Sequence, residues 1–218
     1  AVTDRRAPGW QSGSGSESER CMMVELKVLQ AVRLKGEVSP ADLAATVDED
    51  AASVAQAIAA GTEAGLLSPA GRKLKLSPDG RSRLEWLLQQ ERSGIDRASM
   101  ASAYEEFRSA NADFKIVVSD WTLRDGEPNT HQDADYDAAV LARLEQVHAR
   151  VLAVIDTAGQ QIPRLRGYAE KLEAALGKIR TGDTVWLSEP VVDSYHTAWF
   201  ELHEELLIAA DVTPAHEG

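Results

Sequence analysis

The chain has 218 residues, of which 44% are hydrophobic and 27% charged, so a packed core in one large or two small domains is expected. The formal net charge of −12 is unfavourable for nucleic-acid binding, because phosphate contacts need local positive charge. The single cysteine, Cys21, excludes a disulfide framework and a cysteine metal site, and it favours a cytoplasmic protein. No apolar run approaches the roughly 20 residues of a membrane span, so no membrane partner is expected.

Residues 1–21 are rich in Ser, Gly and Glu, a composition that predicts a flexible tail or linker. The chain opens on Ala1 rather than Met, which indicates a trimmed chain or a part of a longer polypeptide.

Three helical patterns follow in residues 22–66. The first ends at Gly36, a usual helix stop. The second has Ser39 as its N-cap and Pro40 at the first helical position, and the third is capped by Asp50 and extends through Leu66.

The next segment alternates Leu74 and Leu76 with Lys73 and Lys75, which predicts a two-stranded hairpin bounded by Gly71 and a turn at "SPDG". An amphipathic helix closes the unit. Three helices, a hairpin and a trailing helix indicate a winged helix-turn-helix domain with a small β-hairpin wing over residues 22–92.

Two short motifs carry a family resemblance. "SPADLA" opens the second helix and "AGLL" ends the third, and with them residues 24–92 resemble the MarR-like winged-helix regulators. The resemblance implies a DNA-binding transcriptional regulator, and we do not expect an enzyme, because no nucleophile with its base and no other catalytic set is present.

Residues 93–218 are predicted to form an α-helical bundle that serves dimerisation and effector binding, which makes the whole chain mainly α. One long helix is expected over 97–122. "YEEFRSANADF", "LEAALGKIRTGD" and the later His196 resemble the helical effector domain of GntR-type regulators of the FCD class, which implies a cavity for small carboxylates. Lys115 stands where that family has a metal-binding His, leaving Asp113 and His196 as remnants of the ligand set, so we expect neither metal nor cofactor.

A small acidic effector is the expected ligand of the bundle, held by Arg124 beside aromatic walls. The predicted effector-binding residues are Trp121, Arg124, Tyr195, His196 and Trp199. Two alternatives stay open: Trp121 anchors a loop at a helix end, and the histidines of the apolar stripes are half-buried structural residues.

The charge distribution bears directly on DNA binding. From Glu37 to Glu63 there are six acidic residues and no Lys or Arg, whereas Arg72 to Arg83 holds five basic residues and one acid. We therefore expect the wing to contact phosphates and the third helix to face bases. The predicted DNA-binding residues are Ser53, Gln56, Arg72, Lys73, Lys75 and Arg81.

Two hypotheses follow. The first is a cytoplasmic, homodimeric transcriptional regulator that presents two wings to a palindromic DNA site. The alternative is a winged-helix module that binds another protein and no DNA, possibly within a larger polypeptide or complex. The alternative predicts an exposed apolar patch on the third helix, formed by Ala51, Ala52, Ala55 and Ala59.

Overall fold

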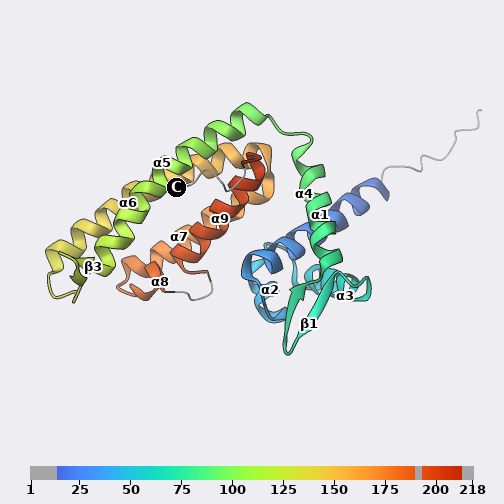
Figure 1. The fold of residues 1–218 in the computed structure, drawn as a ribbon, viewed down its shortest axis with the longest axis horizontal. Helices are drawn as coiled ribbons and strands as arrows, with labels where there is room; N and C mark the ends of the chain where they lie inside the picture. Colours follow the sequence, from blue (N-terminus) through green and yellow to red (C-terminus); the bar gives the residue numbers. More distant parts are fainter. Residues whose placement is uncertain (1–13, 190–192, 213–218) are drawn as a thin grey trace, which may run out of the picture. The chain divides into compact units, whose positions relative to one another are not determined.

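The computed structural model describes residues 14–189 and 193–212, with side chains from residue 16 onward. The chain is mainly helical and divides into two compact units, Ala1–Leu87 and Leu88–Gly218 (Figure 1). None of the helices in the described ranges is both long and apolar enough to cross a membrane.

Helix α1 (Ser14–Lys35) begins within the segment expected to be a tail, so that expectation is wrong for residues 14–21. Residues 1–13 lie outside the described ranges. The later half of α1 is anchored by buried side chains such as Val28 and Val32. Extending an anchored helix is far less costly than nucleating a new one, so the exposed Ser/Glu-rich turns before it continue the helix.

The predicted caps of the next two helices are confirmed. The Ser39 side chain accepts a hydrogen bond from the Asp42 amide at the start of α2 (Pro40–Thr46). Asp50 does the same for Ser53 at the start of α3 (Ala51–Glu63). Helix α3 ends before the expected Leu66, because Gly65 turns the chain with a φ of +73°.

The predicted hairpin is confirmed as β1 (Leu67–Ala70) paired antiparallel with β2 (Lys73–Leu76). Leu74 and Leu76 are buried while Lys73 and Lys75 are exposed, as the two-residue period of a strand requires. Val38, between α1 and α2, bridges to Leu74 and ties the hairpin to the helices.

Helix α4 (Pro78–Arg92) begins directly after Ser77, so the turn expected at "SPDG" is instead the first turn of a helix. The Ser77 hydroxyl accepts a hydrogen bond from the Gly80 amide at 2.9 Å. Pro78 at the start of the helix has no N–H to leave unsatisfied. The same residue types suit both a turn and a helix start, which explains the error.

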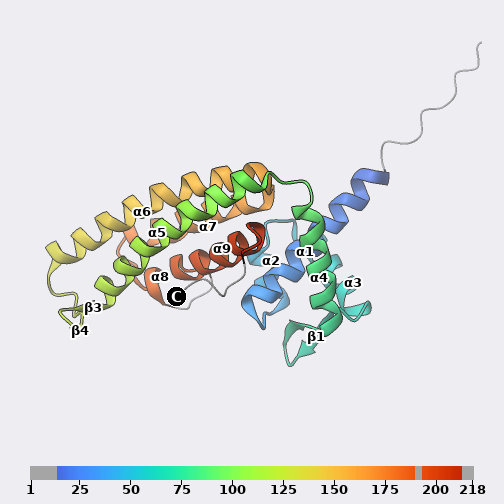
Figure 2. The ribbon, with the colours of Figure 1, turned by 45° about the horizontal axis from the view of Figure 1, so that its top comes forward.

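The second unit is an antiparallel set of long helices joined by short elements. Figures 1 and 2 show α5 lying beside α6 and α7 beside α9. Its elements after α4 are α5 (Arg97–Thr122), β3 (Leu123–Arg124), β4 (Glu127–Pro128), α6 (Ala134–Gln161), the 3₁₀ helix η1 (Pro163–Arg166), α7 (Gly167–Arg180), α8 (Val185–Ser188) and α9 (Tyr195–Ala209). The long helix expected over 97–122 is confirmed, whereas the short β3–β4 pair and α8 were not predicted. The sequence also predicts an inward-facing Val192 on the last helix, and this residue lies outside the described ranges.

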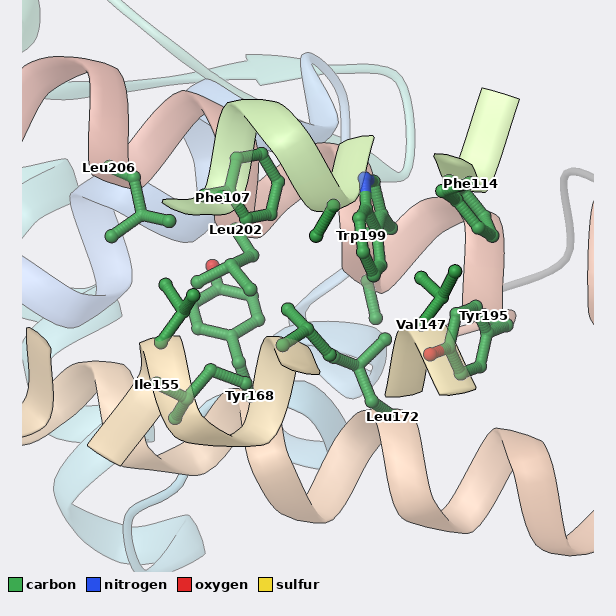
Figure 3. Close-up of a cluster of buried hydrophobic side chains, with 14 of the residues drawn as sticks. Phe107, Phe114, Val147, Ile155, Tyr168, Leu172, Tyr195, Trp199, Leu202 and Leu206 are labelled. Atoms are coloured by element: carbon green, nitrogen blue, oxygen red, sulfur yellow. The ribbon is translucent and has the colours of Figure 1, made fainter. Parts of the chain in front are cut away.

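Side chains from all four long helices of this unit meet in one core (Figure 3). Phe107 and Phe114 of α5 pack on Trp199 of α9, with ring centroids 5.2 and 4.3 Å apart. The Trp199 indole N–H donates to Asn111 at 2.9 Å, so the buried ring leaves no donor unpaired. Aromatic and aliphatic burial, more than helix propensity, therefore holds this unit together.

Two glycines give opposite expectations for substitution by alanine. A Cβ on Gly80 would lie 2.0 Å from the Leu66 carbonyl oxygen, so Gly80→Ala must displace backbone and should destabilise the first unit by about 1–3 kcal/mol. A Cβ on Gly177, within α7, meets nothing within 4 Å, so Gly177→Ala should stabilise by about 0.5–1 kcal/mol. Denaturant unfolding followed by circular dichroism measures both, and equal effects of the two substitutions would refute this packing at Gly80.

Candidate functional site

Four basic side chains around the hairpin are exposed and form no salt bridge within the described residues: Arg72, Lys73, Lys75 and Arg81. Two other cations of the same unit are neutralised by carboxylates. Lys27 pairs with Glu49 at 2.7 Å, and Arg83 pairs with both carboxylate oxygens of Glu25. Within the described residues of this unit, the hairpin is therefore a place where positive charge is left unbalanced.

The local fold gathers these four cations. Lys73 and Lys75 share the outward face of β2, and Arg72 stands at the turn between the strands. Arg81, in the first turns of α4, directs its guanidinium to the Leu76 carbonyl at the end of β2, 3.5 Å away. Such a group of unpaired cations can bind a polyanion through several phosphates at once.

The two residues predicted to face bases, Ser53 and Gln56, differ in whether their side chains are already hydrogen-bonded. Ser53 is held by the helix cap, because its amide and its hydroxyl both donate to Asp50, at 2.9 and 2.6 Å. These hydrogen bonds lower the pKa of Asp50 and keep it charged. Gln56 is exposed on the next turn of α3 and is free to present its amide.

The exposed face of α3 carries no charge before Glu63. Ala51, Ala52, Ala55 and Ala59 are all exposed, which is the small-residue surface that the protein-binding alternative requires. The acidic residues before α3 lie at its N-terminal end, where Asp50 caps the helix. Helix α3 by itself therefore offers phosphates no attraction, in contrast to the hairpin.

The residues predicted to form an effector site fall into two groups. Tyr195 and Trp199 contact each other, with ring centroids 6.1 Å apart, and both contact Phe114, as His196 does. Among the described residues, no ring contact, hydrogen bond or ion pair joins this group to Trp121 or Arg124. Tyr195 and Trp199 are 0% and 3% exposed and belong to the core, because aromatic residues at helical spacing fill the bundle interior. His196 is exposed and stacks on Phe114 with centroids 6.2 Å apart.

The other two members of that set stabilise the loop between α5 and α6. Trp121 packs on His131 with centroids 4.4 Å apart. Arg124 pairs with Asp133 at 2.9 Å and lies over the Tyr136 ring. This arrangement corresponds to the alternative in which Trp121 anchors a loop at a helix end.

His148 lies on the apolar stripe of α6 and is buried within a chain of polar side chains, whereas the structural alternative for the stripe histidines predicted half-burial. Its Nδ1 lies 3.1 Å from the Tyr195 hydroxyl and its Nε2 lies 2.8 Å from Glu173. Glu173 also accepts from Arg180, and these two partners lower its pKa, while burial raises the pKa of Tyr195. Both ring nitrogens of His148 have partners within the protein. These linked polar side chains therefore serve a structural role and do not present a free general base.

A second polar cluster is more deeply buried, and sequence reasoning missed it. Arg164 pairs with Glu91 at 2.9 Å and with Glu205 at 2.6 Å, and all three side chains are at most 11% exposed. Burial opposes the charge on Arg164, but the two carboxylates outweigh it and raise its pKa. Burial and Glu205 also raise the pKa of Tyr168, so its phenol stays protonated. The cluster connects the end of α4 with η1, α7 and α9.

Within the described part of the chain, no group of three or more His, Cys, Asp or Glu side chains could hold a metal ion. Asp113, one of the two residues proposed as remnants of a ligand set, pairs instead with Arg150. Comparison of the chain with protein-family models, curated proteins and solved structures finds no match. The hairpin cations therefore remain the candidate site, on the strength of their geometry alone.

The buried cluster gives a stability prediction. Arg164→Met would leave Glu91 and Glu205 buried without their cation and should destabilise the second unit by about 3–5 kcal/mol. Adding Glu91→Gln and Glu205→Gln to that variant removes the uncompensated charge and should restore much of the loss.

Arg108→Met provides the control, because Arg108 pairs with Glu105 on the exposed face of α5 and should cost less than about 1 kcal/mol. Urea unfolding measures all four proteins. A cost for Arg164→Met no larger than that of Arg108→Met would show that the pairs of Arg164 are not buried in solution.

Proposed function

We propose that the chain is a cytoplasmic DNA-binding transcriptional regulator, in which α1–α4 and the β1–β2 hairpin act as a winged helix-turn-helix. The observation that carries the proposal is the group of four exposed, unpaired cations on and beside the hairpin. A chain with a net charge of −12 that leaves these cations unbalanced keeps a local site for a polyanion.

In this proposal the hairpin supplies affinity and α3 supplies sequence preference. Arg72, Lys73, Lys75 and Arg81 would hold phosphates. Gln56 would face base edges, where an amide bonds adenine through both of its polar atoms. Ser53 would contribute only through its hydroxyl, which already donates a hydrogen bond to Asp50, the N-cap of α3.

The second unit would provide dimerisation and effector binding. Two large apolar side chains on its surface support a role in association: Ile116 of α5 and Phe200 of α9 are 52% and 51% exposed. A two-fold dimer would bring two hairpins to two half-sites.

Charge reversal on the hairpin tests the proposal. Lys73→Glu with Lys75→Glu should abolish binding to mixed duplex DNA at low salt, because two attractive contacts become repulsive. The fold should survive, since both side chains point to solvent while Leu74 and Leu76 keep the hairpin packed. Fluorescence anisotropy with labelled duplex measures the loss.

Arg108→Glu with Lys115→Glu is the matched control, because it changes the net charge equally on exposed positions of α5. It should leave DNA binding within about twofold of the wild type. Equal weakening by the two double variants would mean that only total charge matters, and the proposed site would be wrong.

The exposed alanines of α3 favour a second candidate function, a module that binds another protein and no DNA. Ala55→Arg separates the two candidates. Arginine is a good helix former, so α3 should persist. For a DNA-binding protein the added cation should tighten DNA binding by about 3- to 10-fold, since one further phosphate contact becomes available. For a protein-binding module the large charged side chain should prevent the partner protein from approaching α3 closely. In that case neither the wild type nor the Ala55→Arg variant should bind DNA.

A further inference from the structure

A cavity of about 300 Å³ lies within the second unit, where α4 ends, α5 begins and α9 ends. Its size is at the lower end of the range for small-molecule sites. Neither the hairpin nor the residues predicted for effector binding contribute to it. It is therefore a separate feature that the proposed DNA-binding role does not use.

Two guanidinium groups line this cavity. Arg92 is fixed in place, because its Nη1 donates to the Ile208 carbonyl at 2.9 Å and to Asp211 at 3.2 Å. Its Nε and Nη2 atoms have no hydrogen-bond partner among the described residues, and Arg97 makes no hydrogen bond or ion pair there. The lining therefore includes two arginines whose guanidinium groups keep donors without a partner among the described residues. Planar guanidinium forks match a carboxylate or phosphate group better than any neutral ligand.

The rest of the lining selects among anions. Ile95 and Ala210 are half-buried and Ala209 is buried, so part of the wall is apolar. Among the described residues of the lining, Asp211 is the only acid and opposes the two arginines, which leaves one net positive charge on these residues. One net charge and an apolar wall suit a monoanion with a hydrocarbon body better than inorganic phosphate, which has no apolar part.

We propose that this cavity binds a small organic monocarboxylate. The guanidinium groups of Arg92 and Arg97 hold the carboxylate, and the hydrocarbon part of the ligand packs on Ile95, Ala209 and Ala210. Arg92 is preorganised by its bonds to the end of α9, so little side-chain entropy is lost when the ligand binds.

Calorimetric titration of the full chain with benzoate tests the site. Benzamide is the neutral control of similar shape, and inorganic phosphate is an anionic control without a hydrocarbon part. Benzoate should bind saturably with one site per chain, and the other two compounds should bind at least about tenfold more weakly. No saturable binding of benzoate, or phosphate binding as tight as that of benzoate, would overturn the proposal.

Two substitutions with opposite expected effects locate the site. Arg97→Gln should weaken benzoate binding about 5- to 10-fold, because one charged fork is lost. Asp211→Asn should strengthen it about 2- to 3-fold by removing the opposing charge from a largely exposed position. Asn tolerates the positive φ of 58° at this position, so the backbone is kept, and a gain in affinity cannot arise from unfolding.

Arg108→Gln, which removes an exposed arginine of α5 outside the cavity, should leave benzoate binding unchanged. Equal affinities of the wild type and Arg97→Gln, or weaker binding by Asp211→Asn, would place benzoate elsewhere and refute the assignment. DNA is absent from these titrations, so their failure would leave the proposed DNA-binding function untouched, and the reverse also holds.

Discussion

The absence of any Lys or Arg between Glu37 and Glu63 is the constraint on which the functional interpretation depends. Helices α2 and α3 carry no cation that could attract phosphate, whereas the hairpin and the start of α4 carry four exposed ones. The strand period that buries Leu74 and Leu76 also turns Lys73 and Lys75 outward. One local pattern therefore both packs the hairpin on the helices and creates the positive surface. Packing rests on Leu74 and Leu76 and the proposed binding role in part on Lys73 and Lys75, all within β2.

Local signals in the sequence predicted the local structure well. Ser39 and Asp50 predict helix starts, because their side chains accept hydrogen bonds from backbone amides that the helix leaves unpaired. The helix over 97–122 is evident from its apolar period, and the hairpin from its alternation. The errors occur where one composition suits two structures: "SPDG" fits a turn and a helix start, and a Ser/Glu-rich segment fits a tail and a solvated helical end.

The site residues were harder to predict, because a sequence shows a charge or a ring but not its neighbours. Tyr195 and Trp199 read equally well as the walls of a ligand site and as core, and their burial decides for the core. The sequence around Arg164 does not indicate that this residue lies between two buried carboxylates. Arg97 differs from the paired arginines only in lacking a partner among the described residues, which depends on elements distant in sequence.

The most direct test of the central claim, that the hairpin binds phosphates, is the salt dependence of wild-type binding to mixed duplex DNA, followed by fluorescence anisotropy from roughly 20 to 200 mM salt. The logarithm of the association constant should fall linearly against the logarithm of salt concentration. Three or four phosphate contacts per hairpin give a slope of about −2.7 to −3.6 for each hairpin bound. No binding even at the lowest salt concentration would contradict the claim and would leave the uncharged face of α3 as a surface for another protein.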